Sequence, residues 1–201
     1  MRIVKLFRKG YLPIDENYCG LNRIAKTVSS CFDTVVKNLP PVLKYDCIKL
    51  VLDSENGFSK EEKRITVMLN YNDVFVRNRY EKGVRALILQ HIMLSHFEDV
   101  PGFFRELFSN RQIIKSGFSE DLMFYCFVKL LRARKPRSRN EFLDISLPWL
   151  SFYGTDDFYS SILKDMADAL SPDTPDDLSA LIEKIKNNEI EEAVKSYGAL
   201  Q

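Results

Sequence analysis

The sequence predicts an α+β protein, in which a small antiparallel sheet packs on several helices around one central buried helix. Residues 80–97 form the longest apolar-rich run of the chain, and a helix that is apolar on nearly all sides is typical of a protein core. Two shorter segments, residues 46–53 and 64–70, alternate apolar and polar side chains as half-buried strands do. Much of the remaining chain repeats apolar residues at steps of three and four, which is the helical period.

Length and composition place the chain among ordinary globular proteins. Its 201 residues are enough for one full core. Its content of 45% hydrophobic and 28% charged residues is that of a folded protein and argues against bulk disorder. The four cysteines are scattered without a CxxC pair, which argues against a zinc ribbon and against a disulfide framework. The first residues contain no apolar run of the length that a signal peptide needs. We therefore expect a cytoplasmic protein that does not enter a membrane.

The first half of the chain alternates strand and helix signals. Residues 2–8 are predicted as a short strand, and residues 21–39 as an amphipathic helix that ends at two consecutive prolines. The strands at 46–53 and 64–70 follow, separated by a polar turn and a charged run. A connection of about eleven residues lets two strands pair antiparallel, so that pairing is the expectation.

The central helix at 80–97 carries both histidines of the chain, His91 and His96. Its charged residues lie near its start, and no proline interrupts it. Its remaining polar residues favour a soluble core helix over a membrane span. Gln90 and His91 have apolar neighbours on every side, so both are expected to be buried and hydrogen-bonded.

The second half of the chain is predicted to be mainly helical. Ser119 is placed as an N-cap, with Glu120 and Asp121 in the first turn of the helix that follows. The polar segment SPDTPDD marks a linker, which divides the chain into an α+β core domain, residues 1–170, and an acidic helical appendage, residues 171–201. The predicted helices cover residues 101–110, 120–134, 156–170, 175–186 and 189–197, and the apolar but irregular stretch 140–154 receives no assignment.

The net charge of +1 conceals an uneven distribution. Residues 1–155 carry 25 basic and 17 acidic residues, a net charge of +8, whereas residues 156–201 carry 4 and 11, a net charge of −7. Such a division is typical of a basic body that is covered by its own acidic tail or that meets a polyanion. Two differently solvated faces are the simpler interpretation.

The order of the elements resembles the core of the zincin metallopeptidases, especially the compact gluzincin type. The resemblance covers residues 21–131. In it, ITVMLNYNDVF corresponds to the edge strand, ALILQHIMLSHF to the active-site helix, and GFSEDLMFY to the helix that supplies a glutamate ligand. If a metal is present, the resemblance implies His91, His96 and Glu120 as its ligands.

The histidine spacing departs from that family, whose active-site helix carries His-Glu-x-x-His. His91 and His96 are five residues apart, so they diverge by about 140° around a helix instead of meeting at one ion. Ile92 follows His91, so the glutamate that activates water is missing. We therefore predict no catalytic residue and no cofactor, with zinc as the alternative. Core hydrogen bonding, the helix dipole and a first-turn acid explain His91, His96 and Glu120 without a metal.

The Arg-rich segment 132–139 is the second feature that stands out. Its five cations suit phosphate binding, and they are Arg132, Arg134, Lys135, Arg137 and Arg139. The favoured explanation is that they compensate a helix dipole and contact the acidic tail. No aromatic residues interleave them, so a stacking platform for single strands is not indicated.

These observations predict a catalytically silent, zincin-like domain that acts as a protein-interaction or regulatory module with a protein partner. The first alternative is a nucleic-acid or phosphate-ligand binder that uses the Arg-rich segment 132–139. The second alternative is a metallopeptidase with a rearranged ligand set.

Overall fold

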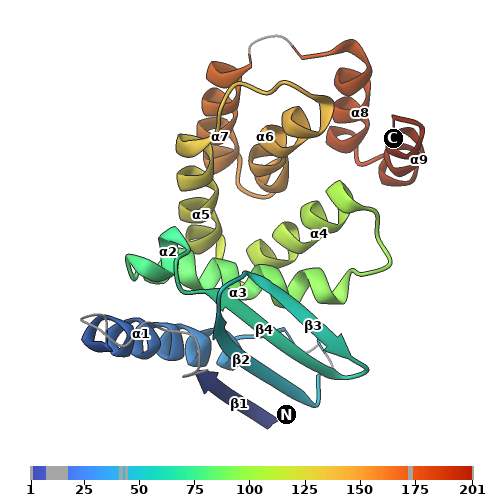
Figure 1. The fold of residues 1–201 in the computed structure, drawn as a ribbon. Coiled ribbons are helices and arrows are strands. Elements are labelled where there is room, and N and C mark those ends of the chain that lie inside the picture. Colours follow the sequence, from blue (N-terminus) through green and yellow to red (C-terminus); the bar gives the residue numbers. More distant parts are fainter. Residues whose placement is uncertain (1, 8–17, 41–42, 44, 172–173, 201) are drawn as a thin grey trace.

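A computed structural model describes residues 2–7, 18–40, 43, 45–171 and 174–200. In these ranges the chain forms four strands and nine helices, so the predicted α+β class is confirmed. Figure 1 shows the sheet together with the helices of residues 18–37, 74–77 and 81–96 in a lower layer, and the helices of residues 102–200 in an upper layer.

The sheet contains β1 (Arg2–Phe7), β2 (Cys47–Asp53), β3 (Gly57–Glu61) and β4 (Arg64–Asn70), in the order β1-β2-β4-β3. β1 pairs with β2, and β2 with β4, in parallel, whereas β3 pairs with β4 antiparallel. The prediction of an antiparallel sheet is therefore right for one pair and wrong for the pairing of 46–53 with 64–70.

The reason for this difference is β3, which lies in the charged connection between the two predicted strands. A tight turn, in which Glu62 has a φ of 50°, joins β3 to β4 as a hairpin. Because β3 reverses the chain before β4 begins, β4 runs parallel to β2. The segment that the zincin resemblance assigns to the edge strand thus lies inside the sheet, and β3 forms the edge.

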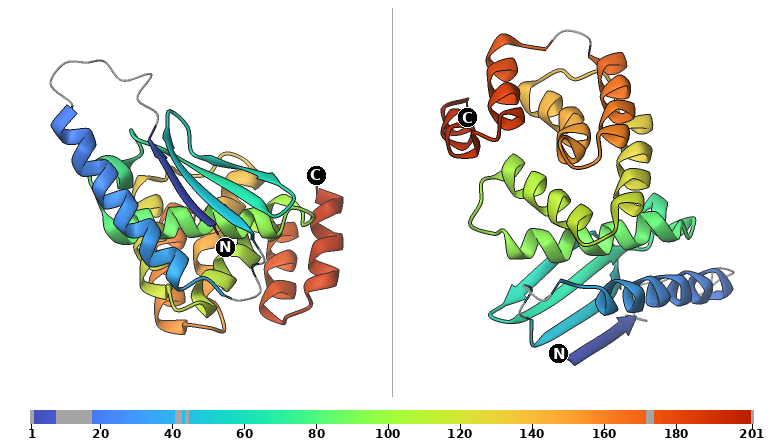
Figure 2. Two further views of the ribbon diagram at one scale, coloured as in Figure 1. Left: turned by 90° about the horizontal axis from the view of Figure 1, so that it is seen from below. Right: turned by 180° about the vertical axis from the view of Figure 1, so that it is seen from behind.

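Helix α3 (Glu81–His96) is the central buried element, as predicted. It contacts β3 and β4 on one side, and α1 (Tyr18–Lys37), α4 (Gly102–Lys115) and α5 (Ser119–Arg132) on its others. Ten of its residues are buried. The right-hand view of Figure 2 shows the same helix, in green, between the sheet and the later helices.

The unassigned stretch 140–154 forms helix α6 (Arg139–Phe152), preceded by Ser138 as its N-cap. Residues 145–152 are all buried, so the helix shows no apolar stripe from which it could be recognised. Pro148 lies inside it, where a proline removes one backbone hydrogen bond. Both features hide the helical period from sequence analysis.

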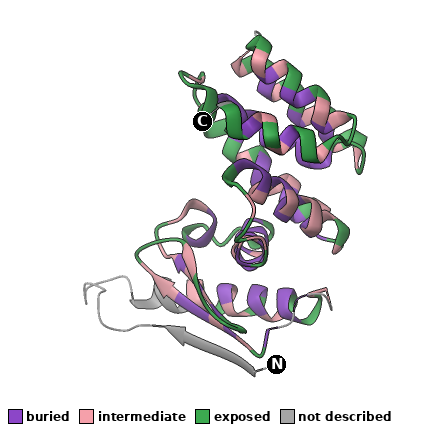
Figure 3. Cartoon of the chain, turned by 90° about the vertical axis from the view of Figure 1, so that its right-hand side faces the viewer, coloured by how far each residue is buried: buried purple, intermediate pink, exposed green. Residues whose placement is uncertain are grey.

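The remaining helices are α2 (Val74–Arg77), α7 (Asp157–Leu170), α8 (Asp176–Lys186) and α9 (Ile190–Leu200). α8 packs on α6, and Tyr197 of α9 contacts the rings of Phe103 and Phe104 in α4. Buried residues of α8 and α9 belong to the same apolar cluster as those of α1, and Figure 3 shows buried positions in both layers. The predicted appendage therefore packs on the predicted core. None of the described helices is long and apolar enough to cross a membrane.

Candidate functional site

The three residues of the alternative metal set do not meet. Glu120 pairs with Lys82 at a distance of 2.7 Å, in the first turn of α3. His91 lies nine residues further along that helix, which corresponds to about 13 Å of axial rise. In the part of the chain that the structure describes, no three His, Cys, Asp or Glu residues approach closely enough to hold a metal ion.

The acid that α5 does bury is Asp121, the neighbour of Glu120. Arg85 of α3 donates to both Asp121 carboxylate oxygens, at 3.0 and 2.7 Å. This charge-assisted bond raises the pKa of the Arg85 guanidinium above its ordinary value. The predicted N-cap is also displaced, because Phe118 precedes the helix and Ser119 instead donates to Asp156.

Gln90 and His91 differ in whether their side-chain polar groups have hydrogen-bond partners. Gln90 is buried and donates to Asn110 of α4, which donates in turn to Ser151 of α6, so its prediction is confirmed. His91 has both ring nitrogens buried, with no hydrogen-bond partner among the described residues, so its prediction is wrong on that point. The nearest aromatic ring is Phe58 of β3, at 6.4 Å between centroids. Burial lowers the pKa of the His91 imidazole to about 4.

His96 lies at the other end of the same helix and is exposed. It occupies the last turn of α3, and its ring contacts Phe97 at 5.1 Å between centroids. The structure therefore directs His91 towards the sheet and leaves His96 at the surface.

The Arg-rich segment is an exposed, largely extended connection between α5 and α6. α5 ends at Arg132, two residues earlier than predicted, and Ala133 and Ser138 have extended backbone angles. Arg139 pairs with Asp177 of α8 at 2.7 Å, which is the predicted contact with the acidic tail. Its other four cations have no acidic side-chain partner in the described ranges.

The last turns of α5 add apolar side chains beside these four cations. Leu131 is 62% exposed and Phe127, one turn earlier, is 36% exposed. We call Phe127, Leu131, Arg132, Arg134, Lys135 and Arg137 together the α5–α6 surface. A cavity of about 350 Å³ adjoins it, lined by Ala133, Arg134, Lys135, Arg137, Glu141, Asp144 and Ile145. Partial burial raises the pKa of the Asp144 carboxyl above its ordinary value.

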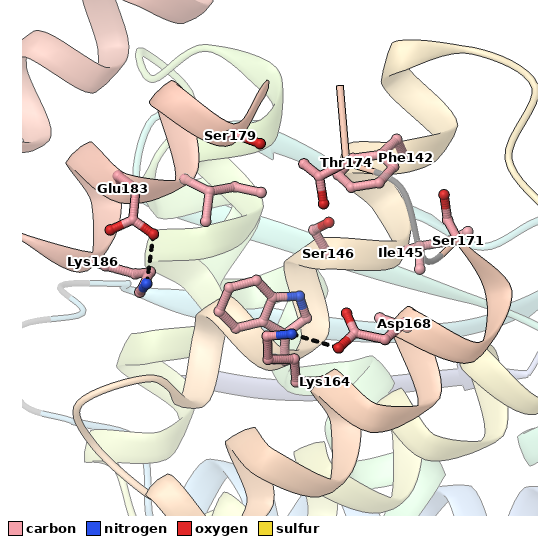
Figure 4. A pocket seen from close by; sticks show the side chains of 13 residues that line it. Phe142, Ile145, Ser146, Lys164, Asp168, Ser171, Thr174, Ser179, Glu183 and Lys186 are labelled. Atoms are coloured by element: carbon pink, nitrogen blue, oxygen red, sulfur yellow. Dashed lines mark hydrogen bonds and ion pairs between the residues drawn. The ribbon is translucent and has the colours of Figure 1, made fainter. Parts of the chain in front are cut away.

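A second cavity, of about 160 Å³, lies between α6, α7 and α8. Figure 4 shows the ion pair Lys164–Asp168 on α7 and the ion pair Glu183–Lys186 on α8 around it, with Ser146 of α6 between them. Trp149, the only tryptophan of the chain, lines the cavity, and the ammonium group of Lys164 lies 5.8 Å from its ring centre. Sequence analysis missed this site because its residues come from the unassigned stretch and from helices on both sides of the linker.

The comparisons with known proteins add no relative. No protein-family model, curated protein or solved structure matches this chain, so its own residues must carry any assignment of function.

Proposed function

We propose that this protein is an interaction module that binds an acidic, partly apolar segment of a partner protein through the α5–α6 surface. The observation that carries the proposal is the combination of exposed Phe127 and Leu131 with four cations that lack acidic side-chain partners in the described structure. Aromatic, aliphatic and Arg side chains of this kind make up the contact surfaces of protein interfaces.

The apolar side chains favour a protein partner over a nucleic acid. Removing one large apolar side chain from water stabilises a complex by about 1.5–3 kcal/mol. An exposed ion pair contributes about 0.2–1 kcal/mol, so the cations chiefly steer the encounter and set its specificity. Phosphate binding by the same cations is therefore the second candidate.

Binding of a designed peptide tests the proposal. The probe is a fluorescein-labelled helical peptide with Leu and Phe four residues apart and Glu at the flanking positions, followed by anisotropy. We expect Leu131→Ala to weaken binding at least about tenfold. The triple variant Arg134→Glu, Lys135→Glu, Arg137→Glu should weaken it more, because repulsion replaces attraction.

The matched control reverses three exposed cations of α1, through Arg23→Glu, Lys26→Glu and Lys37→Glu, and should leave peptide binding unchanged. A short RNA duplex distinguishes the second candidate. Duplex binding that falls steeply between about 50 and 200 mM salt and ignores Leu131→Ala would favour phosphate recognition. Failure of the wild-type protein to bind the peptide would refute the proposal.

The proposal includes catalytic silence, so we expect purified protein to hold no stoichiometric zinc and to hydrolyse no peptide. The motivation is that the two histidines diverge and that Glu120 pairs with Lys82 at the far end of α3. Elemental analysis after extensive dialysis measures this. About one zinc per chain, lost on His91→Ala, would restore the metallopeptidase hypothesis.

A further inference from the structure

We infer that the cavity between α6, α7 and α8 binds a small zwitterion of the α-amino-acid type. This inference concerns a different surface from the proposed function and does not depend on it. It rests on the size of the cavity, on two hydrogen-bond donors among the residues that line it, and on the two ion pairs that also line it.

Size limits the ligand to about ten non-hydrogen atoms. One water molecule needs about 10–15 Å³ of cavity volume, so about 160 Å³ accommodates roughly ten atoms of that size. Pockets for drug-sized ligands and cofactors hold about 300–1,000 Å³. The cavity therefore fits an amino acid and excludes a nucleotide.

Two neutral donors face this space without a protein acceptor. The hydroxyl of Ser146 and the indole N–H of Trp149 have no hydrogen-bond partner among the residues that the structure describes. Both residues are buried, at 3% and 6% exposure, and both line the cavity. Ser151, one turn further along α6, shows the usual alternative, because its hydroxyl donates to the carbonyl of Leu147. Buried hydroxyl and indole groups normally find an acceptor, and a ligand carboxylate would supply one.

The ion pairs favour a ligand that carries both charges. Lys164 and Asp168 pair on one side, Lys186 and Glu183 on the other, so the four groups are neutral in sum. A zwitterion can enter one pair by placing its carboxylate against the lysine and its ammonium group against the acid, which preserves the charge balance. Opening the Lys164–Asp168 pair costs little free energy, because both side chains are about half exposed and an exposed ion pair contributes little to stability.

Part of the remaining lining is apolar and suits an aliphatic side chain, whereas Ser171, Thr174 and Ser179 add hydroxyl groups. Phe142, Ile145, Ala167 and Ile182 contribute the apolar walls. The ligand would thus be an amino acid with an apolar side chain, with its charged end towards Lys164 and Asp168.

The single tryptophan makes the inference directly measurable. The experiment titrates each common amino acid, up to about 10 mM, into the full chain and follows the indole N–H resonance of Trp149 by NMR. We expect a saturable shift with an apolar amino acid. Ser146→Val fills part of the cavity and removes a donor, and Lys164→Gln removes a charge, so each should weaken binding at least about tenfold. Lys195→Gln, on the exposed side of α9, is the matched control and should leave binding of the amino acid unchanged.

Two further ligands separate the zwitterion from simpler chemistry. Acetate lacks the ammonium group, and an N-acetyl amino-acid amide lacks both charges, so neither should compete. An equal response to acetate would overturn the zwitterion and leave a simple anion site. The absence of a saturable shift with every amino acid, or unchanged binding by a folded Ser146→Val protein, would overturn the inference.

Discussion

Gln90 and His91 are adjacent on α3, yet their polar groups meet different surroundings. Gln90 faces α4, where Asn110 and then Ser151 continue a buried chain of hydrogen bonds across three helices. His91 faces the edge of the sheet, where Phe58 is its closest aromatic neighbour and Asp73 is the charge that acts on it. A one-residue step turns a helix by about 100°, which is sufficient to separate the two environments.

The His91 environment predicts a specific pH dependence of stability. Its pKa falls from 6.5 to about 4 on folding, so the unfolded chain binds the proton more readily. Stability from this residue is therefore complete above pH 6.5 and is lost as the pH falls from 6.5 towards 4. The loss amounts to at most about 3 kcal/mol. His91→Phe should remove this part of the dependence, because an uncharged ring replaces the imidazole.

Urea denaturation at several pH values between 7.5 and 4.5 measures the difference between His91→Phe and the wild-type protein. This difference isolates His91 from carboxyl groups whose pKa values burial raises, such as those of Glu106 and Asp144. His96→Gln, at the exposed end of α3, is the control and should retain the wild-type slope. An identical slope in His91→Phe would show that the ring is solvated.

At the scale of elements, the bond between Arg85 and Asp121 joins α3 to α5. Both side chains are largely buried, at 19% and 9% exposure, and the contact is bidentate. Removing one partner of a buried pair leaves the other charge desolvated. The same two helices also share the exposed pair Lys82–Glu120, which solvent screens.

The two pairs predict opposite results for neighbouring acids. Asp121→Ala should lower the free energy of unfolding by about 3 kcal/mol, because Arg85 loses its buried bidentate partner and keeps only the exposed carboxylate of Glu81, at 3.5 Å. Glu120→Ala should leave the denaturation midpoint unchanged, since that carboxylate is solvent-exposed. Chemical denaturation of the two variants provides the comparison. Equal destabilisation by both would show that Arg85 and Asp121 are not coupled in solution.

At the scale of the whole molecule, one apolar cluster includes residues from α1 to α9. The C-terminal helices contribute Leu178, Leu181 and Ile185 from α8, and Tyr197 from α9. Tyr197 lies against Phe103 and Phe104, with ring centres 6.0 and 5.7 Å apart. Shared burial of this kind couples the stability of the tail to that of the helices beneath it.

This coupling predicts a single unfolding transition. Trp149 fluorescence, which reports α6 and the cavity beside α8, should change at the same urea concentration as the far-ultraviolet circular dichroism. Tyr197→Ala should shift both midpoints together, by about 3 kcal/mol in free energy. Separate midpoints in that variant would show that residues 171–201 unfold independently of the other helices.

Features that depend on neighbours along the chain were predictable. The apolar period identified α1, β2, β4 and α7, because one face of each element meets the core and the opposite face does not, and the long uninterrupted apolar run identified α3. The Arg-rich segment was also visible, since its cations are consecutive or nearly so. The charge of this exposed, extended connection depends only on its own residues, so it can be read from the sequence alone.

Features that depend on distant parts of the chain were decided by the tertiary structure. β3 alternates too few apolar residues to be recognised, because it lies at the sheet edge, and its presence reversed the direction of β4 relative to β2. Helix α6 is buried on nearly all sides, which removes its stripe. The choice of Asp121 over Glu120 as the buried acid required the position of Arg85. The cavity at Trp149 combines three helices, and no local pattern encodes their meeting. Periodicity reports which side of an element is buried, whereas strand direction, ion-pair partners and cavities depend on what buries it.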